Sequence, residues 1–279
     1  MAVAISKDIT GPYLSNARNP VLTHRHLSYD YPISGVGHAD LVELEDGRWY
    51  AVALGWRLVD GKYGVLGRET FLVPVTWEEE PYAWKEEKLT WPVFSPATGR
   101  VELAYPTPSG NTAHQSTYRF RDDFDTRQRS PHWNFRRTPA TEFFEVDTAS
   151  GQLRLRLLPT AVGERQQYAF AGIRQRHFEF EALTELELQV AEDRAEAGMA
   201  LVMNDRSALL FTLSGGGELR LVHNRDGAAD VLATAPYDSE NVQLRVTADY
   251  LGLGFYYSAN GNDWQTLAEE VDGSVLAPE

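Results

Sequence analysis

Short apolar runs separated by turn-forming residues make up most of the chain. Residues 49–54 and 71–75 are continuous apolar runs, bounded by glycine and charged residues. Residues 152–157, 218–222 and 242–246 alternate apolar and polar side chains, as half-buried strands do. Turn-forming residues lie between such runs at 45–47, 214–217, 225–227 and 259–261. No long stretch has a helical period, so the pattern predicts an all-β fold.

A change in composition divides the chain into two parts. Residues 105–111 (YPTPSGN) combine proline, glycine and small polar residues, which is typical of a linker. Strands at the observed spacing favour propeller or sandwich units. The pattern therefore predicts two domains, residues 1–105 and residues 118–279.

Composition excludes several classes of protein. A length of 279 residues suits one or two domains. The net charge of −14 argues against nucleic acid as a partner, because phosphate binding needs clustered Lys and Arg. No apolar run approaches about 18 residues, so no membrane span is predicted. Since the chain has no Cys, disulfides and thiolate metal sites are excluded.

Two motifs place one polar side chain behind a glycine at the start of an apolar strand. His38 lies in residues 37–43 (GHADLVE), and Arg68 lies in residues 66–77 (LGRETFLVPVTW). Without further information, His38 suits a hydrogen-bonded core position and Arg68 suits a salt bridge, with Glu69 or Asp40 as its partner. The guanidinium group also offers five donors in a fixed fork, which can hold sugar hydroxyl groups.

Two other sets of polar residues suggest chemistry less clearly. His24 and His26 form a His-x-His pair that could bind zinc, but no third ligand is evident. Asp40 and Glu43 could be mistaken for a catalytic pair, although a spacing of three sends them to opposite faces of a strand. No phosphate-binding glycine loop, nucleophile elbow or H-E-x-x-H zinc motif is present.

The two glycine-led motifs resemble the last part of the five-bladed propeller of glycoside hydrolase family 43, the β-xylosidases and α-L-arabinofuranosidases. The remainder resembles the concanavalin-A-like, jelly-roll β-sandwich that follows that propeller. The resemblance implies that Arg68 contacts substrate and that His24 and His26 lie near the substrate pocket. It also implies that His38 touches a central Ca²⁺ or its waters. We expect His38 and Arg68 to point into one polar cavity. Calcium prefers oxygen ligands, so its shell would be mostly water.

The same resemblance places the catalytic carboxylates outside this sequence. Family members invert configuration with an Asp base, a second Asp and a Glu acid, the acid and base lying about 6.5–9.5 Å apart. All three would precede the stretch that corresponds to residues 2–13, so no catalytic residue is assigned. At about 40–45 residues per blade, the roughly 105 residues before the linker suggest two or three blades of five. The sequence therefore suggests a chain clipped at both ends.

These observations predict a fragment of an inverting glycosidase for xylo- or arabino-oligosaccharides, inactive alone. Its partners would be the sugar, a complementing N-terminal fragment or a second copy of the chain. The absence of a signal peptide favours the cytoplasm. The alternatives are a non-catalytic carbohydrate-binding sandwich, or an interaction protein or inert remnant.

Overall fold

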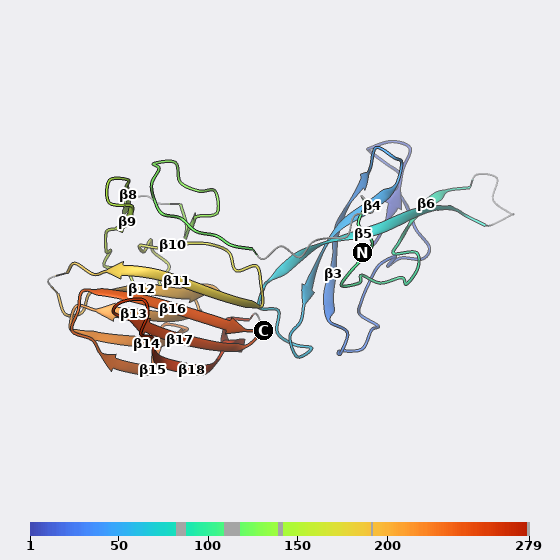
Figure 1. Cartoon of the computed structure of the whole chain (residues 1–279). Coiled ribbons are helices and arrows are strands. Elements are labelled where there is room, and N and C mark those ends of the chain that lie inside the picture. Colours follow the sequence, from blue (N-terminus) through green and yellow to red (C-terminus); the bar gives the residue numbers. More distant parts are fainter. Residues whose placement is uncertain (82–87, 109–117, 139–141, 191, 278–279) are drawn as a thin grey trace. The chain divides into compact units, whose positions relative to one another are not determined.

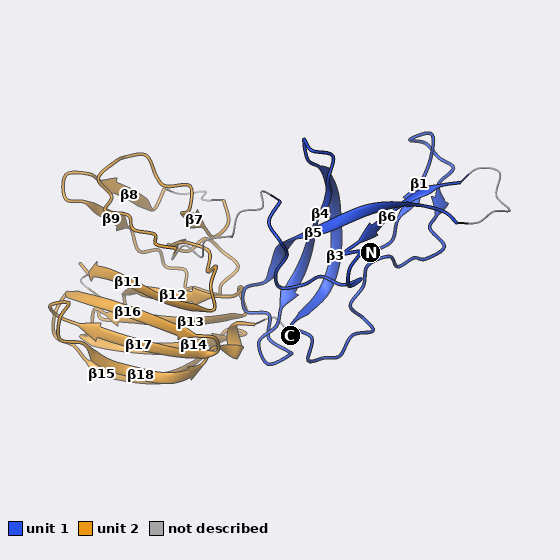
Figure 2. Cartoon of the chain, turned by 45° about the vertical axis from the view of Figure 1, so that its right-hand side comes forward, with its two compact units in different colours: residues 1–116 blue, residues 117–279 orange. Residues whose placement is uncertain are grey.

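The chain folds into two compact β-rich units, residues 1–116 and 117–279 (Figure 2). The computed structural model describes residues 1–81, 88–108, 118–138, 142–190 and 192–277 (Figure 1). Within these ranges the only helix is a single 3₁₀ turn, η1 (Gly273–Leu276), and no helix is long and apolar enough to cross a membrane. The predicted all-β fold is confirmed.

The first unit is built around one antiparallel sheet of four strands. In order across the sheet, these are β3 (Ile33–Glu43), β4 (Trp49–Arg57), β5 (Arg68–Glu79) and β6 (Thr90–Phe94). A separate two-stranded sheet joins β1 (Ala4–Ile5) to β2 (Leu14–Ser15). The estimate of two or three blades is therefore wrong for the described residues. The estimate rested on length alone, whereas residues 16–32 and 95–108 run as loops rather than strands.

Alternation along β4 and β5 separates the two faces of this sheet, although Tyr50 is buried on the face opposite to Ala51. Ala51, Ala53 and Val73 are fully buried on one face, where Leu22 and Val101 from the loops pack against them. The opposite face carries a second set of apolar side chains. Two of these, Val42 and Leu72, are each 41% exposed. We call this opposite face, with Val42, Val52, Leu54 and Leu72, the open face.

Strand β3 departs from regular pairing in its first half. Its register with β4 shifts between Ser34 and Gly37 and again between Gly37 and Asp40. Gly35 has φ 60°, and a Cβ atom there would lie 2.6 Å from Cδ1 of Trp56, so a side chain does not fit. His38 also has a positive φ of 52°. Bulges of this kind bend a strand and re-aim the side chains within it.

The second unit is a sandwich of two antiparallel sheets. One sheet has the order β11 (Glu179–Glu187), β16 (Asn241–Asp249), β17 (Gly252–Ser258), β18 (Gln265–Asp272). The other has the order β12 (Glu196–Val202), β13 (Ser207–Ser214), β14 (Glu218–Arg225), β15 (Ala228–Pro236). Inward-facing residues of both sheets form one core, in which Phe211 and Phe255 meet edge to face with centroids 5.7 Å apart.

A smaller region precedes the sandwich in this unit. It pairs β7 (Asn134–Phe135) with β10 (Ala171–Gly172), and β8 (Phe144–Asp147) with β9 (Gln152–Leu155). Asp205, in the β12–β13 turn, ties this region to the sandwich by accepting hydrogen bonds from Arg136 at 2.5 Å and Arg137 at 2.8 Å. The alternation over residues 152–157 gives a strand only as far as Leu155.

Candidate functional site

Arg68 stands at the first position of β5 with an exposed side chain. Its neighbour Glu69 is held instead by Arg57, whose Nε and Nη2 atoms donate to the two carboxylate oxygens at 2.8 and 2.7 Å. No described residue forms a salt bridge or hydrogen bond with the Arg68 guanidinium. Glu69, one of the two partners considered for Arg68, is therefore already paired with Arg57. The Arg68 guanidinium stays available to a ligand.

His38 lies within the bulged part of β3, and its side chain is exposed. The next residue, Ala39, packs against the buried core of the unit. Because the register shifts on both sides of His38, simple alternation along the strand does not fix the direction of the His38 side chain. The left-handed backbone at His38 sets that direction instead. The sequence marked His38 through the preceding glycine, but the bulge itself could not be read from the apolar pattern.

The register of the sheet relates His38 to Arg68. Ser34, Trp56 and Arg68 form one row across β3, β4 and β5, and Gly37, Leu54 and Thr70 form the next paired row. His38 follows Gly37 directly. Both residues therefore lie in the same half of the sheet, on strands separated by β4. A cavity shared by the two side chains remains a prediction.

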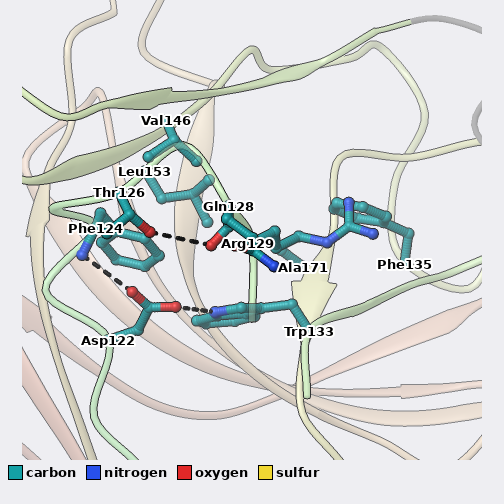
Figure 3. Close-up of a pocket in the computed structure, with 10 residues that line it drawn as sticks. All are labelled: Asp122, Phe124, Thr126, Gln128, Arg129, Trp133, Phe135, Val146, Leu153 and Ala171. Carbon is teal, nitrogen blue, oxygen red and sulfur yellow. Dashed lines mark hydrogen bonds between the residues drawn. The ribbon is translucent and has the colours of Figure 1, made fainter. Parts of the chain in front are cut away.

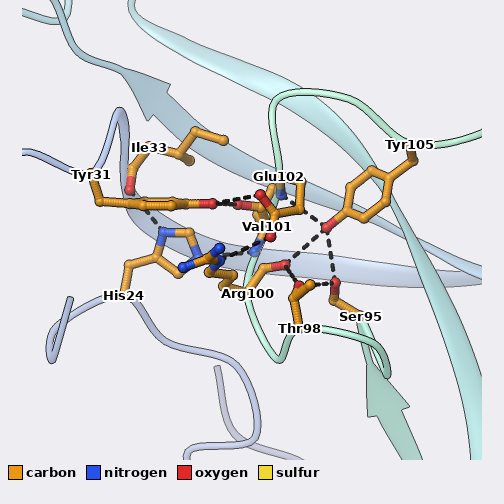
Figure 4. A network of polar contacts seen from close by, with 9 residues as sticks. All are labelled: His24, Tyr31, Ile33, Ser95, Thr98, Arg100, Val101, Glu102 and Tyr105. Carbon is orange, nitrogen blue, oxygen red and sulfur yellow. Dashed lines mark hydrogen bonds and ion pairs between the residues drawn. The ribbon is translucent and has the colours of Figure 1, made fainter.

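His24 is buried, with 9% of its surface exposed, and both ring nitrogens are used within the fold (Figure 4). Its Nδ1 atom lies 2.7 Å from the Ile33 carbonyl oxygen, and its Nε2 atom lies 3.0 Å from the Val101 amide nitrogen. Since Nε2 must accept from that N–H, the neutral ring carries its proton on Nδ1. His24 thus joins the start of β3 to the loop after β6. A contact between His24 and a sugar would require one of these bonds to break.

Neighbouring side chains complete this network around residues 100–105 (Figure 4). The Tyr31 hydroxyl donates to the Val101 carbonyl at 2.6 Å, and its ring meets the His24 ring edge to face. The hydrogen bond from Arg100 lowers the pKa of the Glu102 carboxyl. The sequence showed no signal for this network, because its members are far apart in the chain. His26, in contrast, is exposed.

Burial of His24 makes the stability of the protein depend on pH. Desolvation, the largest cause, lowers the pKa of His24 below the ordinary value near 6.5. The unfolded chain therefore takes up a proton first, and the free energy of unfolding falls as the pH drops below about 6.5. We expect urea titrations at several pH values to show a weaker dependence in His24→Gln. The exposed control His26→Gln should keep the full dependence, and an equal effect of both changes would contradict this assignment.

The carboxyl groups give no sign of a general acid in the described residues. Such an acid needs a raised pKa in order to stay protonated. Every described carboxyl whose pKa is shifted is shifted downward, by hydrogen bonds from arginine, hydroxyl or backbone donors. These groups are Asp8, Asp46, Glu102, Asp123, Asp147, Asp205 and Asp226.

The described residues offer few ligands for calcium. No three His, Asp or Glu side chains there converge as a metal site. His38 alone would supply a single nitrogen, whereas Ca²⁺ takes six to eight oxygen ligands. These residues do not by themselves fit a calcium site, and no step below involves the ion.

An aromatic pocket in the second unit is packed rather than open (Figure 3). Trp133 donates through Nε1 to Asp122 at 2.7 Å, and the Arg129 guanidinium lies over the Phe135 ring at 4.6 Å. The space left among the lining residues is about 10 Å³, room for one water at most. These partly buried aromatic residues pack against one another, with the Phe124 and Trp133 ring centroids 5.8 Å apart, and leave no room for a sugar.

Fold and site together define a class of protein. The first unit holds a four-stranded sheet with the exposed Arg68, and the second unit holds a two-sheet sandwich. Residues 1–82 match "Glycosyl hydrolases family 43", and residues 121–279 match "Beta xylosidase C-terminal Concanavalin A-like domain". The chain belongs to glycoside hydrolase family 43.

Individual relatives agree with this membership. A "Xylosidase/arabinosidase" of Butyrivibrio fibrisolvens is 34% identical over 292 residues, covering 100% of this chain and 53% of the relative. The "Non-reducing end alpha-L-arabinofuranosidase BoGH43B" of Bacteroides ovatus is 33% identical over 247 residues, covering 87% of this chain and 45% of the relative. The crystal structure of the GH43 protein BlXynB from Bacillus licheniformis matches with a TM-score of 0.84 at 26% identity, covering 99% and 52% of the two chains. This chain spans about half the length of these relatives, and the predicted propeller-plus-sandwich fold is confirmed.

Proposed function

We propose that this chain is the part of an inverting family 43 glycosidase that holds a xyloside or arabinoside without supplying the catalytic carboxylates. The exposed Arg68 guanidinium, with which no described residue pairs, is the observation that carries the proposal. Arg68 donates to sugar hydroxyl groups and brings positive charge toward a catalytic carboxylate. His26 and His38 line the same pocket, and His24 fixes the loop that carries His26 through its bonds to Ile33 and Val101. The relatives' names support both xylose and arabinose as the sugar.

A chimera tests the role of Arg68. The part of the B. fibrisolvens enzyme that this chain does not cover would be joined to this chain, and kcat/KM measured on aryl-xylosides and aryl-arabinofuranosides. Losing hydrogen bonds from a charged donor should make Arg68→Ala roughly 10- to 150-fold slower. Arg18→Ala is the control, because Arg18 makes only an exposed 3.5 Å pair with Glu78.

Different results would contradict the role of Arg68 and the proposed function as a whole. A chimera that is active and equally impaired by both changes, or by neither, would overturn the role of Arg68. Soluble, folded chimeras that show no activity on any pentoside would overturn the proposed function as a whole.

A further inference from the structure

The second unit contains a cleft of about 280 Å³ beside the turn that joins β13 to β14. This volume is close to the lower end of the range for small-molecule sites, roughly 300 Å³. The sequence marked this region only as a turn. Its lining comes from the segment that follows β11, the end of β13 with the β13–β14 turn, and the β15–β16 loop with Tyr237, Asp238, Ser239 and Glu240.

The floor of the cleft is apolar and its aromatic side chain is fixed. Leu188 and Leu213 are buried members of the sandwich core. The Tyr237 hydroxyl donates to the Asn241 carbonyl at 2.8 Å, and its ring meets the Tyr257 ring edge to face at 5.8 Å. A ring held in this way gives a flat apolar surface, on which the C–H face of a sugar can stack without ordering a mobile side chain.

The rim of the cleft is rich in groups that accept hydrogen bonds. Asp238 and Glu240 are exposed, and no described residue donates to either side-chain carboxylate. The hydroxyl oxygens of Ser214 and Ser239 accept from the Glu218 and Asn241 amides at 3.3 and 3.2 Å. Both hydroxyl protons therefore remain able to donate. The two carboxylates repel anions and suit a neutral ligand that carries several hydroxyl groups.

The turn at residues 215–217 contributes three glycines, and therefore no side chains, to one side of the cleft. Gly217 has φ 78°, and a Cβ atom at Gly215 would lie 2.3 Å from the Glu192 carbonyl oxygen. The Gly215 and Gly216 amides are used within the fold, donating to the Ala195 and Asp193 carbonyls. Gly215 is thus required by close packing against the Glu192 backbone, and these residues add no side chain to the cleft.

We infer that this cleft is a saccharide-binding site, separate from the Arg68 pocket, with one sugar ring of a pentose oligosaccharide stacked on Tyr237. Ring hydroxyl groups donate to Asp238 and Glu240 and accept from Ser214 and Ser239. Only the choice of a pentose rests on the proposed function. The site would hold a long xylan or arabinan chain on the sandwich, without taking part in cleavage.

Nuclear magnetic resonance of the full chain tests the site directly. On titration with xylohexaose, the glycine amide signals of residues 215–217 should move. Asp238→Asn with Glu240→Gln, which keeps the shapes of both side chains, should raise the dissociation constant tenfold or more (about tenfold for each 1.4 kcal/mol). The control Asp125→Asn removes an exposed carboxylate of the same unit that does not line the cleft. It should leave the titration unchanged.

Three results would overturn this inference. First, the amide signals of residues 215–217 could stay unchanged when xylohexaose is added. Second, the double variant could bind xylohexaose with the dissociation constant of the parent. Third, calcium alone could shift the same signals, and EDTA could abolish the response to the sugar. If the glycine signals stay fixed while Arg68→Ala abolishes sugar binding elsewhere, the cleft assignment fails and the proposed function stands. If the cleft binds xylohexaose but the chimera has no activity, the proposed function fails and the cleft stands.

Discussion

Purified on its own, the chain is expected to release aryl groups from aryl-xylosides and aryl-arabinofuranosides no faster than buffer does. A positioned acid or base typically contributes about 10²–10⁴-fold, so the lack of both removes about 10⁴–10⁸-fold. The described carboxyl groups offer no general acid that would contradict this expectation, because every shifted carboxyl pKa among them is lowered rather than raised.

The measurement is a side-by-side assay of this chain, the chimera and the intact B. fibrisolvens enzyme. The chimera and the enzyme should turn over and the single chain should not. Turnover by the single chain that disappears in Arg68→Ala would show that a working acid and base lie within these 279 residues. It would then be necessary to search residues 37–79 and their neighbours for both groups.

Replacing His24 by alanine is expected to lower the free energy of unfolding of the first unit by about 2–6 kcal/mol. The change leaves the Ile33 carbonyl and the Val101 amide buried without their partner, and each unsatisfied group costs about 1–3 kcal/mol. It also removes the ring that packs against Tyr31.

Urea unfolding followed by tryptophan fluorescence measures this loss. The exposed control His26→Ala should stay within about 0.5 kcal/mol of the parent. His24→Asn, whose side chain still has a donor and an acceptor, should recover part of the difference. A loss no larger in His24→Ala than in His26→Ala would mean that the network around residues 100–105 does not hold the unit together.

Several of the longer strands were predictable from sequence because each is a local pattern. Residues 218–222 and 242–246 alternate, and both lie within sandwich strands whose inner faces form the core. The number of blades was not predictable from length alone. Residues 16–32 carry many apolar side chains, but in the structure they cover the sheet as a loop.

The residues of the candidate site also differ in whether the sequence could predict their roles. Arg68 could be singled out because a glycine and an apolar strand flank it in sequence. The role of His24 could not, because its partner Val101 lies 77 residues away. The left-handed backbone of His38 was equally hidden, since bulges depend on pairing with β4 rather than on the sequence of β3 alone.

The open face of the β3–β6 sheet has a thermodynamic consequence. Val42 and Leu72 each leave 41% of their surface to water, and covering them would contribute about 25 cal/mol per Å² of apolar area. Anything that covers this face in the folded state only will therefore raise the melting temperature. Well above the dissociation constant, the gain grows by about 1.4 kcal/mol for each tenfold rise in the concentration of the covering molecule. The stability of the first unit is thus set partly by what surrounds it, and a melting temperature describes it only together with the concentrations at which it was measured.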